Sequence, residues 1–179
     1  MMTAANQLTL LRLLLVPVFA LCLLYGRPGW ALVTFAVAGA TDALDGLLAR
    51  RTGPTTLGAW LDPMADKLLL TTMMIMLSIP SLAPIQRLPM WLVVLVITRD
   101  VGIIATVAIV NLAVTRRTFR PSWFGKAATV AYVLTGVVGL YVNYAETPSP
   151  LFTLGVWISG ILTIVSGLEY IARMRIRES

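Results

Sequence analysis

The sequence predicts an all-α integral membrane protein with six transmembrane helices, folded as a single domain over residues 1–179. Hydrophobic residues make up 58% of the 179 residues and charged residues only 12%, whereas soluble domains carry about 25% charged residues. Because a bilayer-spanning helix takes about 20 apolar residues, six spans fit this length and leave room for short loops. The composition excludes a soluble enzyme and a disordered chain.

Six apolar runs form the expected spans, and turn-forming residues separate most of them. The runs cover residues 8–25, 30–48, 57–79, 89–113, 122–144 and 151–172. Gly and Pro, which favour turns, mark breaks at 26–29, 53–54, 80–89 and 148–150. The first run has no basic segment before it and no small-residue cleavage site after it, so we expect a span and not a cleaved signal peptide.

Basic residues gather on one side of the expected bundle. They lie in the N-terminal segment, in the loops after the second and fourth spans and at the C-terminus, whereas the remaining loops hold only Arg27 and Arg87. The larger group is Arg12, Arg50, Arg51, Arg116, Arg117, Arg120, Arg173, Arg175 and Arg177. The positive-inside rule therefore predicts that both termini are cytoplasmic. The net charge of +6 needs no nucleic acid partner, since topology and anionic lipid headgroups explain it.

An acidic cluster carries the most informative chemistry of the chain. Asp42 and Asp45 lie near the end of the second span, and Asp62 and Asp66 lie near the start of the third. Spacings of three and four residues place each pair on one face of a helix. Because a short loop joins these spans as antiparallel neighbours, we expect the four carboxylates to converge just inside the cytoplasmic boundary.

Four carboxylates in a low-dielectric site repel one another, and one charge at a helix centre already costs about 2.5–3.5 kcal/mol. Arg50 and Lys67 offset part of this repulsion, and divalent cations can offset the rest. The chain has no His and one cysteine, Cys22, so the available ligands are oxygens, which select Mg²⁺, Mn²⁺ or Ca²⁺. Two such ions would balance four negative charges, an arrangement that recurs in phosphoryl displacement.

A divalent-cation transporter or channel is the alternative from another functional class, because intramembrane carboxylates also line ion paths. The acids gather at one end of the expected bundle, however, and the first and fifth spans carry none. This distribution favours a binding site at the membrane boundary over a continuous path.

The acidic cluster and its neighbours resemble the signature of the CDP-alcohol phosphatidyltransferases, D-x-x-D-G-x-x-A-R followed by G-x-x-x-D-x-x-x-D. All of its fixed positions are present: Asp42, Asp45, Gly46, Ala49, Arg50, Gly58, Asp62 and Asp66. A pattern with this many fixed positions is specific, unlike a lone glycine motif. The spacer at 51–57 is shorter than is usual in the family, and we interpret it as a shortened loop.

Two further segments resemble the phosphatidylglycerophosphate synthase branch of this family. They are Asn6-x-x-Thr9-x-x-Arg12 near the N-terminus and Gly125-Lys126-x-x-Thr129 at the start of the fifth span. Arg12 either lines the cytoplasmic end of the site or anchors the first span. The resemblance therefore covers most of the chain and implies the CDP-alcohol phosphotransferase fold.

The resemblance implies transfer of a phosphatidyl group from CDP-diacylglycerol to an acceptor alcohol, with release of CMP. It implies that the carboxylates of Asp42, Asp45 and Asp62 bind two divalent ions, Mg²⁺ or Mn²⁺. Asp66 would take the proton of the acceptor hydroxyl and share in metal binding. The residues implied to accommodate the cytidine and the diphosphate are Gly46, Ala49, Arg50 and Gly58.

The identity of the acceptor depends on a second set of charges. Glycerol-3-phosphate, the acceptor we favour, needs fixed cations for its phosphate, and the candidates are Lys126, Arg120, Arg117 and Arg99. The Arg99-Asp100 pair, however, departs from the Arg-Glu common in that branch and is similar to the CMP-forming cardiolipin synthases. Phosphatidylglycerol as acceptor is therefore the alternative.

The resemblance also implies a homodimer in a lipid bilayer. Gly136, Gly139, Gly155 and Gly160 are small residues that suit helix contacts within or between protomers. No Arg- and Ser-rich transit segment precedes Asn6, so we expect a bacterial cytoplasmic membrane with the active site facing the cytoplasm.

Overall fold

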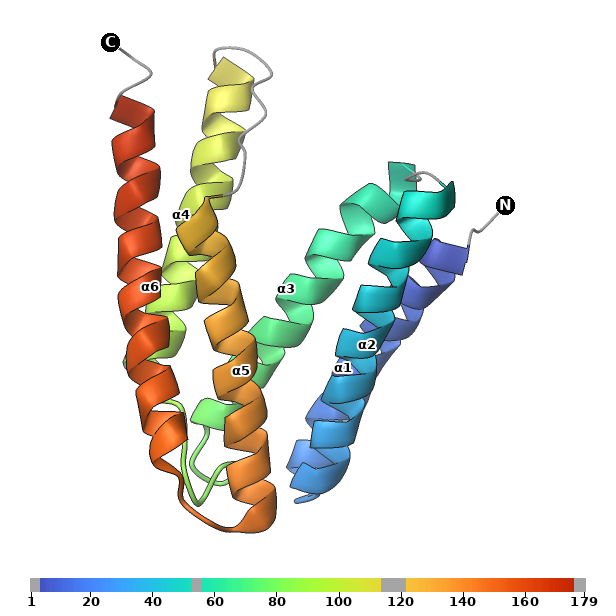
Figure 1. Cartoon of the computed structure of the whole chain (residues 1–179), viewed down its shortest axis with the longest axis vertical. Coiled ribbons are helices and arrows are strands. Elements are labelled where there is room, and N and C mark those ends of the chain that lie inside the picture. The colour runs from blue at the N-terminus through green and yellow to red at the C-terminus, as the bar shows by residue number, and fades with distance from the viewer. Residues whose placement is uncertain (1–3, 53–55, 114–121, 176–179) are drawn as a thin grey trace. The chain divides into compact units, whose positions relative to one another are not determined.

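The computed structural model describes the backbone of residues 4–52, 56–113 and 122–175, with side chains in 7–42, 61, 63–106 and 122–172. All regular secondary structure in this part of the chain is helical, with no strand. Its helices are α1 (Ala4–Leu24), α2 (Pro28–Thr52), α3 (Thr56–Ser78), α4 (Met90–Ala113), α5 (Trp123–Ala145) and α6 (Pro150–Arg175) (Figure 1). Each helix coincides with one of the six predicted apolar runs, which confirms the all-α prediction.

The turn between α1 and α2 follows directly from its sequence. Gly26 has a φ of +66°, a left-handed conformation that glycine adopts without steric cost. The amide of Arg27 donates to the carbonyl of Cys22 (2.8 Å), and that of Gly26 donates to Leu23 (2.9 Å). These two bonds form the Schellman motif, which satisfies the last carbonyls of a helix. Pro28 then opens α2, where its fixed φ suits the first helical position.

The chain divides into two compact units, and each is described by itself. The first comprises residues 1–87 and 139–148, and the second comprises 88–138 and 149–179. The prediction of a single domain is not tested by this division and stays a prediction.

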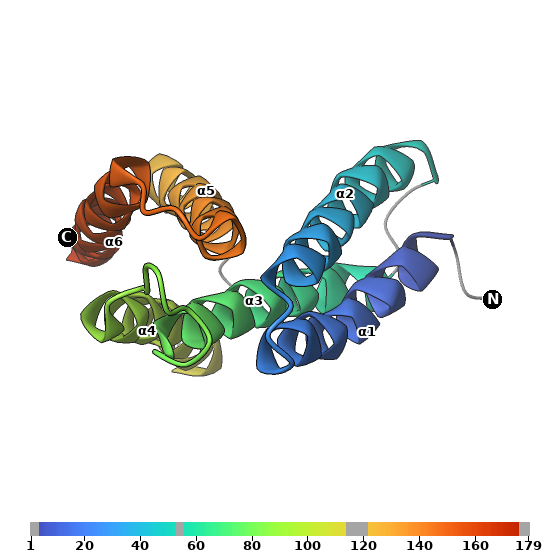
Figure 2. The same cartoon turned by 90° about the horizontal axis from the view of Figure 1, so that it is seen from below.

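In the first unit, α1 packs against α2 and α3, and α1 and α2 run side by side in Figure 2. The Phe19 and Phe35 rings meet with centroids 5.9 Å apart. Ala31, Ala38 and Ala65 are fully buried, and such small side chains let membrane helices approach closely. Pro63 lies inside α3 without ending it.

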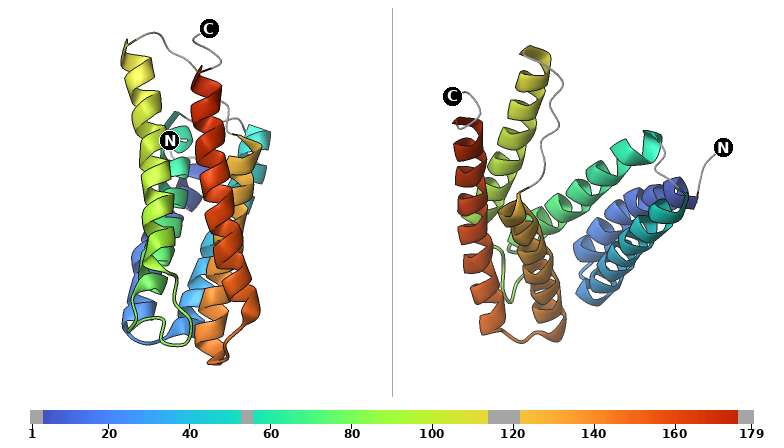
Figure 3. Two further views of the ribbon diagram at one scale, coloured as in Figure 1. Left: turned by 90° about the vertical axis from the view of Figure 1, so that its left-hand side faces the viewer. Right: turned by 45° about the horizontal axis from the view of Figure 1, so that its top comes forward.

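In the second unit, α4 packs against α6, as the left panel of Figure 3 shows. A Cβ atom built on Gly160 would lie 2.9 Å from the Trp91 ring, and one on Gly155 would lie 2.6 Å from the Thr135 hydroxyl. Both glycines therefore permit close helix contacts, as predicted, and these contacts lie within one chain.

The outer surfaces of the helices suit a lipid environment. Large apolar side chains such as Leu14, Trp30 and Leu168 are exposed, which in water would be unfavourable for so many residues. In the described residues, three helical segments are long and apolar enough to cross a membrane, namely Gln7–Leu24, Trp123–Ala145 and Pro150–Ala172. The protein is therefore an integral membrane protein, and the full count of six spans stays a prediction.

Candidate functional site

A fully buried arginine brings two of the predicted carboxylates together in the first unit. The Arg12 guanidinium on α1 binds the Asp42 carboxylate on α2, with Nη2 and Oδ1 2.9 Å apart. It also binds the Asp66 carboxylate on α3, with Nη1 and Oδ1 2.6 Å apart. The predicted convergence of the second and third helices is therefore present for these two carboxylates.

Local sequence places the three charged side chains where the helices meet. Thr9, Arg12, Phe19 and Leu23 are all buried, and their spacing puts them on one face of α1. The buried Ala65 and Leu69 of α3 lie one turn apart, and Asp66 is the next residue after the first of them. The acids therefore stand at the edge of a packed apolar face, with the guanidinium on its buried side.

Both carboxylates are partly exposed, although the arginine that binds them is buried. The Asp42 side chain is 49% exposed and the Asp66 side chain is 45% exposed, whereas Arg12 is not exposed at all. Two carboxylates against one guanidinium leave a net charge of −1 among these three groups. Accessible carboxylate oxygens with excess negative charge fit a hard divalent cation such as Mg²⁺ or Mn²⁺ in donor chemistry.

The rest of the predicted signature lies on the same two helices. The backbone places Asp45, Gly46, Ala49 and Arg50 on α2, and Gly58 and Asp62 on α3. Their side chains lie outside the described residues, so their part in the site stays a prediction. Among the side chains that the structure describes, no group of three or more acidic or cysteine residues could hold a metal.

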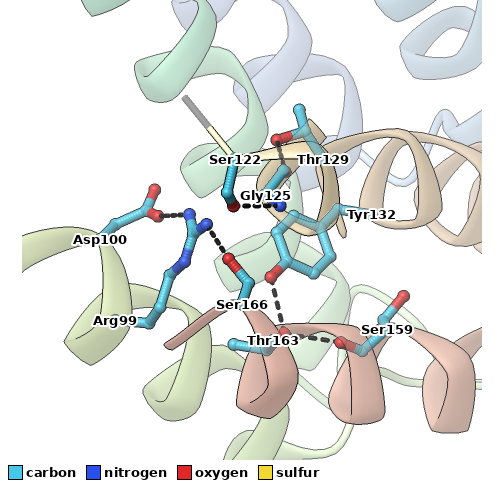
Figure 4. A network of polar contacts seen from close by, with 9 residues as sticks. All are labelled: Arg99, Asp100, Ser122, Gly125, Thr129, Tyr132, Ser159, Thr163 and Ser166. Carbon is cyan, nitrogen blue, oxygen red and sulfur yellow. Dashed lines mark hydrogen bonds and ion pairs between the residues drawn. The ribbon is translucent and has the colours of Figure 1, made fainter. Parts of the chain in front are cut away.

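The predicted acceptor-binding cations lie in the second unit. Arg99 on α4 donates from Nη1 to the Asp100 carboxylate, 2.8 Å away, and from Nη2 to the Ser166 hydroxyl on α6 (Figure 4). Lys126 on α5 is exposed, with its ammonium 5.8 Å from the Trp123 ring centroid. Arg117 and Arg120 lie outside the described residues, so their role stays a prediction.

A network of hydroxyl groups extends beside Arg99, and the sequence analysis missed it. The Tyr132 and Thr163 hydroxyls are 2.6 Å apart, and Thr163 also donates to the Ser159 carbonyl at 2.6 Å. Ser159, Thr163 and Ser166 recur every three or four residues on α6, so they form a polar stripe on an apolar helix (Figure 4). That spacing is the signal that would have revealed them.

The sequence alone leaves the role of Arg12 open. It predicts that this residue either lines the cytoplasmic end of the site or anchors the first span. Its position offered a signal, because it is the one charged residue in the first apolar run. An ionisable residue within a membrane segment is a functional-site hypothesis by default.

The membrane-embedded helices and the paired carboxylates of Asp42 and Asp66 are compatible with a membrane enzyme that uses a divalent cation. The pattern of the CDP-alcohol phosphatidyltransferase family matches residues 2–165 of the chain. The chain belongs to this family, whose members transfer a phosphatidyl group from CDP-diacylglycerol to an alcohol and release CMP. Membership favours the enzyme over the divalent-cation transporter.

The chain is similar to relatives with two named activities. It is 42% identical to the "Probable phosphatidylglycerophosphate synthase" of Mycobacterium tuberculosis (strain ATCC 25618 / H37Rv), over 94% of this chain and 80% of that protein. It is 30% identical to the "CDP-diacylglycerol--glycerol-3-phosphate 3-phosphatidyltransferase" of Bacillus subtilis (strain 168), over 97% of this chain and 95% of that protein. A "Cardiolipin synthase (CMP-forming)" of Streptomyces coelicolor is 35% identical over 72% of this chain and 60% of that protein.

Proposed function

We propose that the protein is a phosphatidylglycerophosphate synthase, which transfers the phosphatidyl group of CDP-diacylglycerol to glycerol-3-phosphate. The observation that carries the catalytic part is the convergence of Asp42 and Asp66 on Arg12 with both carboxylates open to a ligand. The similarity to two relatives that bear this activity in their names, each along more than nine-tenths of the chain, supports the choice of acceptor.

In the proposed reaction, the hydroxyl oxygen of the acceptor attacks the β-phosphorus of CDP-diacylglycerol. The bond between this phosphorus and the bridging oxygen breaks, and CMP leaves with the electron pair. Asp66 accepts the hydroxyl proton as the new phosphodiester forms, a role for which a carboxylate must lie within hydrogen-bond reach of that hydroxyl. General-base assistance of this kind contributes about 10²–10⁴-fold to a rate.

Two divalent ions would be held by the other three aspartates of the signature, Asp42, Asp45 and Asp62. The Asp66 carboxylate would share in this metal binding besides accepting the proton. Bound Mg²⁺ or Mn²⁺ would supply neutralisation of the diphosphate and of the charge that develops on the leaving group. The proposed surroundings of the cytidine diphosphate are Gly46, Ala49, Arg50 and Gly58. Small side chains at three of these positions leave room for a bulky headgroup beside the helix backbones.

The proposed pocket for the acceptor phosphate consists of Lys126, Arg117, Arg120 and Arg99. Lys126 supports this assignment best, because its ammonium is exposed and has no acid among its described contacts. Arg99 already binds Asp100 and Ser166, so a phosphate at this guanidinium would share it with a carboxylate. Charge-assisted hydrogen bonds from such cations are the strong contacts of phosphate sites.

We also propose that six spans carry this site in a bacterial cytoplasmic membrane, as a homodimer with both termini and the active site on the cytoplasmic side. The asymmetry of the basic residues supports the orientation. A lipid substrate supports the location, because its acyl chains stay in the bilayer while its headgroup reaches the polar cluster.

A CMP-forming cardiolipin synthase, with phosphatidylglycerol as acceptor, is the second candidate. The Arg99-Asp100 pair and the similarity to the Streptomyces coelicolor cardiolipin synthase favour it. In this case the acceptor brings its own acyl chains and needs no phosphate pocket open to the cytoplasm.

The deciding experiment measures CMP release by the purified protein in detergent with CDP-diacylglycerol and Mg²⁺, with glycerol-3-phosphate or phosphatidylglycerol added in parallel. Release with glycerol-3-phosphate alone is the expected result. Release with phosphatidylglycerol alone would replace the proposal by the cardiolipin synthase. If neither acceptor leads to CMP release, in protein whose cooperative unfolding shows that it is folded, both acceptors are excluded and other alcohols are tested.

A further inference from the structure

The burial of the Arg12 guanidinium carries a desolvation cost that an uncharged side chain in the same place would not have. This guanidinium is fully buried, and transferring an ion out of water costs several kcal/mol unless its partners have excellent geometry. An apolar side chain of similar volume would fill the same space without this cost. A cation at this buried position therefore indicates a function that a leucine or methionine side chain could not fulfil.

The contacts of Arg12 show what that function is. Nη1 and Nη2 point at carboxylates from two different helices, α3 and α2, at 2.6 and 2.9 Å. The planar guanidinium presents its donors in a fixed fork, so it sets the orientation of both acceptors at once. Each carboxylate accepts from Arg12 at its Oδ1, and about half of each acidic side chain is exposed.

We propose that Arg12 is the positioning residue of the acidic cluster, holding the Asp42 and Asp66 carboxylates in the geometry that a divalent cation requires. This inference rests on the proposed roles of these two aspartates. Groups that hydrogen-bond to metal ligands fix the orientation of those ligands. Their loss costs about 10–100-fold in metal affinity.

A purely electrostatic role for Arg12 predicts the opposite sign. A fixed positive charge at hydrogen-bond distance from two metal ligands repels a cation, and at 4 Å one unit charge pair contributes about 4 kcal/mol at an effective dielectric constant of 20. If charge alone mattered, removing the guanidinium would tighten metal binding, and lysine would replace arginine without loss. If positioning matters, metal affinity falls in both cases.

The test measures Mn²⁺ binding to the purified full-length protein in detergent, by electron paramagnetic resonance of free Mn²⁺ and without any substrate. The variants are Arg12→Lys, which keeps the charge and loses the fork, and Arg12→Met, which loses both. We expect Arg12→Lys to bind Mn²⁺ about 10–100-fold more weakly, with the Mg²⁺ concentration for half-maximal CMP release raised by the same factor. Arg27→Lys, the same change at an exposed arginine in the turn between α1 and α2, is expected to leave Mn²⁺ affinity unchanged.

The outcomes separate this inference from the proposed function. Wild-type affinity in Arg12→Lys, or tighter binding in Arg12→Met, would overturn the positioning role while Asp42→Asn and Asp66→Asn still weaken Mn²⁺ binding. If those two aspartate variants bind Mn²⁺ like the wild type, the metal assignment fails and the inference fails with it. Because Arg12→Lys keeps its charge, it remains informative if Arg12→Met does not fold.

Discussion

Two arginines of the described helices, Arg12 and Arg99, each bind an acidic side chain, yet they do so in different ways. Arg12 is fully buried on α1, and its acids come from α2 and α3. Arg99 on α4 is 16% exposed, its acid is the adjacent Asp100, and its second partner is the neutral hydroxyl of Ser166. One arginine therefore joins three helices through charge, and the other joins two through a hydrogen bond.

The difference lies in the balance of charge and in what remains accessible. The three groups of the Arg12 cluster carry one more negative than positive charge, and its carboxylates are about half exposed, which suits the proposed cation. The Arg99 pair is neutral as a set, and the Asp100 side chain is only 27% exposed. A neutral ion pair with a hydroxyl group beside it joins α4 to α6 and carries no excess negative charge for a cation.

The largest expected effect is that of removing the Asp66 carboxylate. We expect Asp66→Asn to lower the rate of CMP release by about 10²–10⁴-fold, the contribution of a general base. The asparagine amide has nearly the same shape, but the change removes one of the two carboxylates that bind the buried Arg12, so we also expect a lower Tm and measure the rate on protein that is folded at the assay temperature. CMP release from CDP-diacylglycerol with Mg²⁺ and glycerol-3-phosphate is the measurement.

Glu146→Gln provides the matched control for that variant. Glu146 is exposed in the turn after α5, and the change again replaces a carboxylate by an amide. The control should retain the wild-type rate. Full activity in Asp66→Asn would remove the base assignment and leave the two arginine clusters without the functional contrast drawn between them.

The next effect concerns stability at the other arginine. Arg99→Met removes the salt bridge to Asp100 and the hydrogen bond to Ser166, and we expect a loss of about 1–3 kcal/mol. For a chain of this length each kcal/mol corresponds to about 2–4 °C in Tm. Thermal unfolding in detergent, with Mn²⁺ binding as the second readout, checks that stability falls while metal affinity stays. A loss of metal affinity would show that the two clusters are not independent.

The fold was largely predictable, because apolar runs and turn residues are local features. Gly26 and Pro28 marked the turn between the first two helices, and the Schellman hydrogen bonds are present there. Helix limits differ from the predicted runs where charged residues continue a helix, as at the end of α2, which extends to Thr52. The length of an apolar run reflects the thickness of the hydrocarbon layer. A helix continues as long as its backbone hydrogen bonds continue, so it can extend beyond the apolar run.

The site was predictable only to the extent that its residues are neighbours in the sequence. Spacing along one helix, together with the short loop between two helices, predicted that Asp42 and Asp66 come together. The partner of both, Arg12, lies on a third helix, and no spacing rule links it to them. The Arg99–Asp100 pair was visible because the two residues are adjacent, but Ser166 on α6 was not. Contacts between helices that are distant in the sequence depend on how the helices pack. Residue spacing in a single sequence does not predict that packing.

A smaller effect tests how tightly Arg99 is packed. A Cβ atom on Gly125 would lie 2.9 Å from the Arg99 Nη2 atom and 3.1 Å from the Ser122 hydroxyl. Gly125→Ala therefore forces the guanidinium to move, and we expect overpacking of about 1–3 kcal/mol to outweigh the gain of about 0.8–1 kcal/mol that alanine gives in a helix. Gly102→Ala on α4 is the control, since nothing lies within 4 Å there and alanine gains about 0.8–1 kcal/mol in a helix. Thermal unfolding should therefore show Tm changes of opposite sign, and equal shifts would contradict the tight packing around Arg99.

The smallest expected effect isolates the hydroxyl network from the charges. Thr163→Val keeps the shape of the side chain but removes the hydroxyl that lies 2.6 Å from that of the buried Tyr132. We expect a loss of about 1 kcal/mol, because the change removes the hydrogen bond with the buried Tyr132 as well as the one to the Ser159 carbonyl within α6. Thr153→Val, an exposed position on the same helix, should leave Tm unchanged. If the two variants unfold at the same temperature, the hydroxyls contribute nothing measurable, and Arg99 and Asp100 alone would account for the stability of this region.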